Sequence, residues 1–138
     1  MGSVSAYFDG SCEPINPGGT AKWGFVILKE GEIIHHANGV IGKGEGMTSN
    51  VAEYHALQAC LEFLTVAFPD EEIEIFGDSK MVINMVNETW GRSKPHRKAP
   101  HLKKVLERCK QLAAKLPYSG ISWVPREENE LADFYSKQ

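Results

Sequence analysis

The sequence has few cysteines, no long apolar run and no excess of positive charge. Its three cysteines, Cys12, Cys60 and Cys109, form no CxxC pair, which argues against both a disulfide framework and a zinc site. No apolar run approaches the length of a membrane span, and the N-terminus has no apolar signal-peptide core. We therefore expect a cytoplasmic protein with reduced thiols and no membrane association.

The chain of 138 residues carries a net charge of −3, which argues against indiscriminate binding of polyanions. The charge is unevenly distributed, because residues 92–115 contain nine basic residues and one acid, Glu107. That segment has a net charge of +8, so the rest of the chain carries −11. Such a basic stripe suits a protein that binds an anion on one side and a cation on another, and it is also typical of a solvated helix face.

With 42% hydrophobic residues, the chain has room for the core of one domain, residues 1–138. Alternating apolar residues predict strands, and apolar residues at helical spacing predict helices. The first expected strand begins at Val4 and ends on Asp9, within the stretch 4–12. The other expected strands are 21–29, 32–41, 72–77 and 118–124, and the expected helices are 51–68, 79–87, 100–115 and 129–136. The order βββαβααβα predicts an α/β fold with a five-stranded mixed sheet, three antiparallel strands and then two parallel ones, flanked by helices.

Two acids stand where predicted strands end. The first strand ends on Asp9, whose carboxylate has apolar neighbours and must be neutralised, hydrogen-bonded or bound to a cation if it is buried. Asp78 follows the fourth strand and could simply cap the next helix. If the fourth strand instead runs parallel to the first and beside it, Asp9 and Asp78 are neighbours on one rim of the sheet.

Two further acids have ordinary alternatives. Asn50 and Glu53 have the spacing of a capping box, and a first-turn Glu53 would also place a carboxylate near the sheet edge. Asp133, on the last predicted helix, could be a solvated surface acid. Several carboxylates on one rim would repel one another unless they share a divalent cation such as Mg²⁺. Two such ions suit in-line attack on a phosphodiester.

Several short motifs spread along the chain are shared with one known family. They are FDGSC at 8–12, NPGG at 16–19, WG at 23–24, TSNVAEY at 48–54, GDS at 77–79, WVPRE at 123–127, Asn129, and AD at 132–133. On these residues the sequence resembles the ribonuclease HI family over nearly its whole length. The DGS triplet alone would be weak evidence for the resemblance. Four acids in the family's order, each within one of these motifs, make the evidence strong.

The resemblance implies a ribonuclease H fold and an endonuclease that cuts the RNA strand of RNA–DNA hybrids, leaving 5′-phosphate and 3′-hydroxyl ends. It places the four catalytic, metal-binding acids at Asp9, Glu53, Asp78 and Asp133, with Asp9 bridging two Mg²⁺ ions, for which Mn²⁺ could substitute. The partner it implies is the hybrid duplex. We expect a monomer with no obligatory protein partner and no separate hybrid-binding domain.

By the same resemblance, a set of residues is expected to contact the hybrid, partly through ribose 2′-hydroxyls in the minor groove. They are Gly10, Ser11, Cys12, Asn16, Thr48, Ser49, Asn50, Ser79, Trp90, Arg97 and Lys98. For Ser11 and Cys12 the alternative is turn packing, and for Thr48 it is an ordinary helix start. Arg97 and Lys98 belong to a short basic loop, residues 92–98, that stands where some family members have a helical basic protrusion, and Trp90 precedes this loop.

One departure from the family concerns the loop before Asp133. Some members carry a histidine there, whereas this chain has Glu127 and Glu128, which could substitute for it or have no such role. Two other functions stay open. The chain could be another metal-dependent nuclease of the same fold, or a non-catalytic hybrid-binding module.

Overall fold

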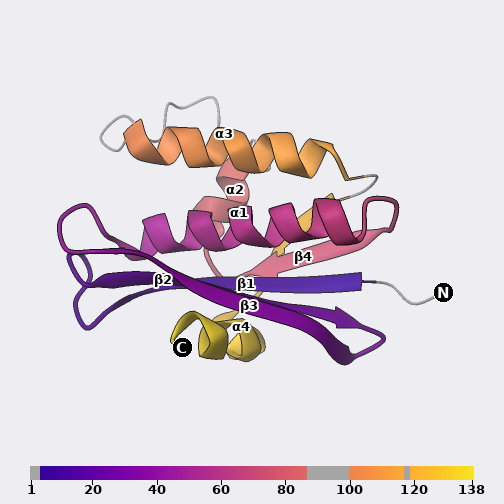
Figure 1. Ribbon diagram of the computed structural model, residues 1–138, viewed down its shortest axis with the longest axis horizontal. Coiled ribbons are helices and arrows are strands. Elements are labelled where there is room, and N and C mark those ends of the chain that lie inside the picture. The colour runs from indigo at the N-terminus through magenta and orange to yellow at the C-terminus, as the bar shows by residue number, and fades with distance from the viewer. Residues whose placement is uncertain (1–3, 87–99, 117–118) are drawn as a thin grey trace.

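The computed structural model describes residues 4–86, 100–116 and 119–138 (Figure 1). These residues form five strands, four α-helices and one 3-10 helix. In chain order they are β1 (Val4–Glu13), β2 (Thr20–Lys29), β3 (Glu32–Lys43), α1 (Ser49–Ala67), β4 (Ile73–Gly77), α2 (Lys80–Val86), α3 (Pro100–Ala114), β5 (Ser119–Trp123), the 3-10 helix (Arg126–Glu128) and α4 (Glu130–Ser136). The predicted order of strands and α-helices is confirmed.

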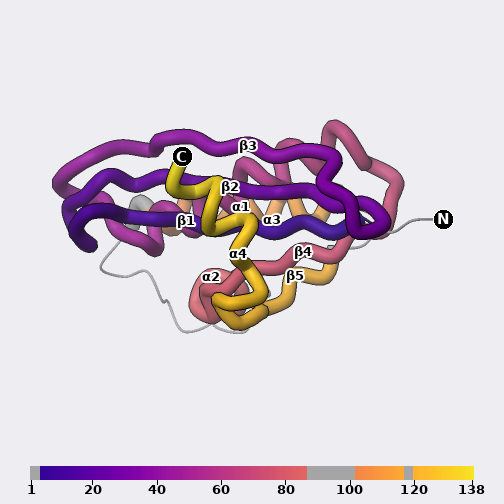
Figure 2. The backbone as a smooth tube through the Cα atoms, turned by 90° about the horizontal axis from the view of Figure 1, so that it is seen from below, coloured from indigo at the N-terminus to yellow at the C-terminus, as the bar shows by residue number. Residues whose placement is uncertain are grey.

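The five strands form one mixed sheet with the order β3-β2-β1-β4-β5 (Figure 2). β1 pairs antiparallel with β2, and β2 pairs antiparallel with β3. β4 runs parallel to both β1 and β5. The predicted arrangement of three antiparallel strands followed by two parallel ones is therefore confirmed, and β1 is the central strand.

Helices cover both faces of the sheet. α1 and α3 lie on one face and α4 lies on the other (Figure 1). Leu57, Leu61 and Leu64 on α1 are fully buried, in a core shared with apolar side chains of β1 and β2 such as Phe8 and Ile27. Burying such side chains supplies most of the free energy that holds α1 on the sheet, at roughly 1.5–3 kcal/mol each.

The turn between β2 and β3 consists of Glu30 and Gly31. Both residues have positive φ angles, 53° and 82°. A two-residue turn with φ above zero at both positions matches the right-handed twist of the strands that it joins, and glycine adopts this conformation without steric cost. The strands expected at 21–29 and 32–41 are therefore present and joined by a tight hairpin.

Two local predictions about the ends of elements are wrong. β1 continues to Glu13, so Asp9 lies inside the strand rather than at its end. The N-cap of α1 is Thr48, whose hydroxyl accepts a hydrogen bond from the Val51 N–H at 3.1 Å. Asn50 therefore lies inside the helix, and the capping box between Asn50 and Glu53 does not form. Because Thr48 already caps the helix, the Glu53 side chain is free to point elsewhere.

In the parts of the chain that the structure describes, no helix combines the length and the apolar character needed to cross a membrane.

Candidate active site

The site lies where the pairing between β1 and β4 ends. Their parallel pairing ends at Tyr7 and Phe76, whereas β1 continues to Glu13. Beyond that point no strand among the described residues pairs with the β4 side of β1, although its β2 side stays paired along the whole length. Side chains from other elements can therefore reach the middle of β1 around this open side. Asp9 lies there and is only 5% exposed.

Gly10 brings α1 unusually close to this part of β1. A Cβ atom on Gly10 would lie 2.3 Å from both the Ala52 carbonyl carbon and the Glu53 nitrogen, which are backbone atoms that a side chain could not displace cheaply. The Gly10 N–H donates a hydrogen bond to the Glu53 carboxylate. The absence of a side chain at residue 10 thus places Glu53, itself 6% exposed, beside the central strand rather than near the sheet edge as predicted.

Asp78 directly follows β4 and is held from two directions. The Trp123 indole Nε1–H donates to the Asp78 backbone carbonyl at 3.1 Å. The Asn129 amide Nδ2 donates to Asp78 Oδ2 at 3.3 Å and to the Phe8 carbonyl at 2.9 Å. Asn129 is 1% exposed, so these hydrogen bonds are shielded from water and tie Asp78 to the central strand.

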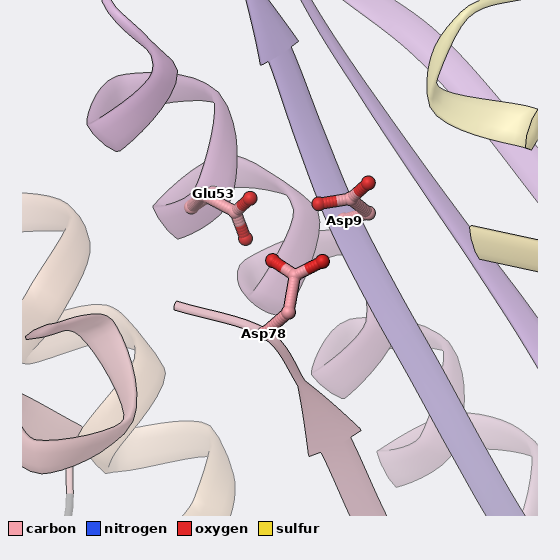
Figure 3. Close-up of side chains that lie close together, drawn as sticks. All are labelled: Asp9, Glu53 and Asp78. Carbon is pink, nitrogen blue, oxygen red and sulfur yellow. The ribbon is translucent and has the colours of Figure 1, made fainter. Parts of the chain in front are cut away.

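The side chains of Asp9, Glu53 and Asp78 converge (Figure 3). One carboxylate oxygen from each residue lies within 4.8 Å of the other two. The prediction that acids remote in the sequence meet at one place is therefore confirmed for these three. The structure does not scatter them into separate solvent, and none of the three makes a described ion pair with a lysine or arginine.

Burial and mutual repulsion disfavour the charged forms of these acids. Burial raises the pKa of Asp9 to about 7, with the charges of Asp78 and Asp133 acting in the same direction and a hydrogen bond from Glu53 acting against them. Burial, followed by the charge of Asp9, raises the pKa of Glu53 well above its ordinary value. Both causes favour the protonated form of Glu53 when no cation is bound.

The donor set fits a hard divalent cation. The Glu53 Oε2 atom is buried without a hydrogen-bond partner in the described part of the chain, which is costly for a carboxylate oxygen. Mg²⁺ and Mn²⁺ accept carboxylate oxygens as ligands. A shared cation would give the unpaired Glu53 Oε2 atom a partner and would offset the repulsion among the three acids.

Asp133 lies next to this group on α4. It is not one of the three acids whose oxygens lie within 4.8 Å of one another. Its carboxylate does lie close enough to Asp9 to raise the pKa of Asp9, and it lines the same cavity. It also pairs with Lys137, at 3.5 Å from Asp133 Oδ1 to Lys137 Nζ.

The four acids line an open cavity of about 340 Å³. Six of the residues expected to contact substrate also line it, namely Gly10, Ser11, Cys12, Ser49, Asn50 and Ser79. Asn16 and Thr48 do not line it. Trp90, Arg97 and Lys98 lie outside the described residues.

Several of these side chains make internal hydrogen bonds. The Ser11 hydroxyl donates to the Ser136 carbonyl at 2.9 Å, and the Cys12 thiol donates to the Ile15 carbonyl at 3.3 Å. Asn16 bonds both the backbone and the hydroxyl of Ser49 through its amide. The alternatives named for these residues are therefore real contacts, namely turn packing for Ser11 and Cys12 and a helix start for Thr48. These contacts do not exclude a further role.

Sequence reasoning assigned no role to three residues of the site. Arg126 and Lys137 line the cavity, and Asn129 holds Asp78. Arg126 and Asn129 belong to motifs that carry the family resemblance, which was the available signal. Lys137 stands four residues after Asp133, a spacing that is also common on ordinary solvated helices. Glu127 and Glu128 line a different cavity, next to Tyr7 and Leu28.

The Asn129→Ala variant tests the support of Asp78. Removing the amide leaves the buried Phe8 carbonyl unpaired, so we expect the free energy of unfolding to fall by about 1–3 kcal/mol. Any cleavage activity should fall further than the folded fraction does, because Asp78 loses its anchor. Urea denaturation and activity at a temperature where the variant is folded measure the two effects.

Asn38→Ala is the matched control, because Asn38 is an exposed asparagine on β3. It should change the free energy of unfolding by less than about 0.5 kcal/mol. Equal losses in the two variants would contradict a supporting role for Asn129.

The chain is similar to known proteins over nearly its whole length. The profile of the reverse transcriptase-like family matches residues 7–138. A curated ribonuclease HI from Halobacterium salinarum is 34% identical over 132 residues, which is 96% of this chain and 61% of that protein. This chain thus spans about three fifths of the length of that relative.

Two solved structures are also similar. RNase H1 from Halobacterium salinarum has a TM-score of 0.82 and 33% identity, with 99% of this chain and 96% of that chain covered. LC11-RNase H1 in complex with an RNA/DNA hybrid has a TM-score of 0.82 and 28% identity, with 98% and 94% covered.

Proposed function

Since this chain belongs to the ribonuclease HI family, we propose that it is a metal-dependent endonuclease that hydrolyses the RNA strand of RNA–DNA hybrids. The observation that carries the proposal is the meeting of Asp9, Glu53 and Asp78 within 4.8 Å, in a cavity that Asp133 also lines. A relative with 28% identity binds an RNA/DNA hybrid in its solved structure, which supports the choice of substrate.

The four acids have distinct places in this proposal. Asp9, Glu53 and Asp78 would hold one divalent cation, and Asp9 and Asp133 would hold a second. Glu53 and Asp133 both lie close enough to Asp9 to shift its pKa, which supports a contact of Asp9 with both ions. Mg²⁺ is the proposed cofactor and Mn²⁺ a possible substitute. When bound, the ions would lower the pKa of the attacking water and stabilise the leaving 3′ oxygen, which gives 5′-phosphate and 3′-hydroxyl ends.

The remaining residues of the cavity would orient the hybrid. Gly10, Ser11, Cys12, Ser49, Asn50 and Ser79 surround the acids, where backbone and hydroxyl groups could read ribose 2′-hydroxyls and so distinguish RNA from DNA. Asn16 and Thr48, beside the start of α1, are the proposed contacts to a DNA-strand phosphate. Trp90, Arg97 and Lys98 are proposed to guide phosphates from the basic loop.

A cleavage assay on three duplexes tests the proposal. The full chain is incubated with end-labelled RNA–DNA, RNA–RNA and DNA–DNA duplexes, in Mg²⁺ or in EDTA. We expect cutting of the RNA strand of the hybrid alone, in Mg²⁺ alone, with products that a 5′-phosphate-dependent exonuclease degrades. Binding without cutting would favour a non-catalytic hybrid-binding module. Cutting of DNA, or digestion only from an end, would favour a different nuclease of this fold.

A further inference from the structure

The last turn of α4 places a lysine against the fourth acid. The Lys137 ammonium lies 3.5 Å from Asp133 Oδ1 and 3.4 Å from Glu13 Oε1. These two carboxylates come from different elements, since Glu13 ends β1 and Asp133 lies one turn before Lys137 on α4. All three residues line the cavity that holds Asp9 and Glu53. One positive charge is therefore shared between two acids at the rim of the site.

The backbone that carries Lys137 is held firmly. The neighbouring Ser136 is fully buried and accepts a hydrogen bond from the Ser11 hydroxyl at 2.9 Å. Gly24 packs directly against the same residue, because a Cβ atom on Gly24 would lie 2.4 Å from the Ser136 nitrogen. On the other side, Lys22 Nζ donates to the Gln138 carbonyl at 3.2 Å. The backbone of Lys137 thus cannot drift from the site, whereas its side chain is 46% exposed and can move between partners.

We propose that Lys137 is a positioning residue that competes with a divalent cation for Asp133, and that Glu13 receives its ammonium group when the cation binds. The inference rests on the proposed function, since it concerns the cation that Asp133 would hold. In the protein without metal, Lys137 neutralises Asp133 and keeps a fourth charge from adding to the repulsion around Asp9. When a cation arrives, the ammonium moves to Glu13, away from the ligand oxygen.

Electrostatics sets the expected size of the effect. A single charge several ångströms from a divalent cation at a water-exposed rim raises its dissociation constant by about tenfold if it cannot move. Because Lys137 can move to Glu13, the observed penalty should be smaller, about threefold. Removing Lys137 should tighten binding of the cation, and removing Glu13 should weaken it. An ordinary helix-stabilising pair between Asp133 and Lys137 would also oppose the cation, but the effect of removing Glu13 would then not depend on Lys137.

The test measures binding of Mn²⁺, counted by electron paramagnetic resonance, to the full chain without nucleic acid, with Mg²⁺ as competitor. The ion whose dissociation constant is followed is the one that the Asp133→Asn variant no longer binds. Lys137→Met should lower its dissociation constant by about threefold to tenfold. Glu13→Gln should raise it by about twofold to fivefold, since Lys137 is then left with Asp133 alone.

The double variant separates competition from long-range charge effects. If Glu13 acts by accepting the Lys137 ammonium, then Glu13→Gln should not change the dissociation constant of the cation in the Lys137→Met background. Equal effects of Glu13→Gln in both backgrounds would overturn the proposal, as would unchanged or weaker binding in Lys137→Met. Lys29→Met is the matched control, because Lys29 pairs with Glu71 at 3.6 Å and does not line the cavity.

The same titration distinguishes this inference from the proposed function. If the unaltered chain binds neither Mn²⁺ nor Mg²⁺ at millimolar concentrations, the metal-dependent function itself fails, and this inference fails with it. If the unaltered chain binds the ions but Asp133→Asn loses none, or Lys137→Met binds as the unaltered chain does, only the inference about Lys137 is overturned.

Discussion

Replacing Asp9 with asparagine is expected to abolish Mg²⁺-dependent cleavage of an RNA–DNA hybrid and to leave the protein folded and more stable at neutral pH. Asp9 lies beside Glu53 and Asp78 in the cavity that Asp133 also lines, and it belongs to both proposed cation sites, so its loss would affect each of them. An amide has nearly the same shape as the carboxylate, which preserves packing on β1. We expect cleavage to fall by at least a thousandfold, or about 4 kcal/mol in the activation barrier.

The gain in stability should depend on pH in a defined direction. The pKa of Asp9 rises from 3.8 in the unfolded chain to about 7 in the folded protein. The folded state therefore binds the proton more tightly, and in the absence of metal this group lowers the free energy of unfolding as pH rises from about 4 to about 7. Asparagine does not titrate. The stability difference should be near zero at pH 4 and reach at most about 4 kcal/mol above pH 7.

Urea denaturation in EDTA at pH 4.5, 6.0 and 7.5 measures this difference. Asp70→Asn, at an exposed acid in the loop before β4, is the matched control and should leave both cleavage and the pH profile unchanged. Full cleavage activity in Asp9→Asn would refute the assignment of the site. A stability difference that is flat with pH would refute the account of a buried, repelled carboxylate.

Gly10→Ala is expected to destabilise the protein by about 3 kcal/mol and to reduce cleavage about a hundredfold even where the variant is folded. The added methyl group would meet the backbone of Ala52 and Glu53 at 2.3 Å. Because neither strand nor helix backbone can yield locally, α1 must move away from β1. Glu53 moves with α1, so its carboxylate separates from Asp9.

Gly42→Ala is a matched control on β3. Its nearest contact would be Met47 Sδ at 3.1 Å, the far end of a flexible side chain that can turn away. We expect this variant to lose less than about 1 kcal/mol and to cleave normally. Thermal denaturation and activity at 25 °C compare the two variants. Equal, small losses in both would show that the close approach at Gly10 does not position Glu53.

Some features of the site could not be predicted from local sequence. The spacing of Asn50 and Glu53 matches a capping box, but Thr48 caps the helix instead, and nothing in the spacing distinguishes the two. Asn129 and Lys137 act on Asp78 and Asp133 through contacts that depend on where α4 lies. An asparagine before a helix and a lysine four residues after an aspartate are common for purely local reasons, so their spacing predicts no site.

The sequence by itself determined the order of strands and helices, the parallel and antiparallel pattern of the sheet, and the four candidate acids. These follow from hydrophobic periodicity, turn residues and short motifs, which are local properties of the chain. The tertiary structure alone decided that Asp9 lies within β1, that Gly10 admits α1 close enough to bring Glu53 beside it, and that Lys137 faces Asp133. The reason is physical. Which charges share one cavity depends on how closely the backbones of separate elements can approach, and that distance is set by packing across the whole domain.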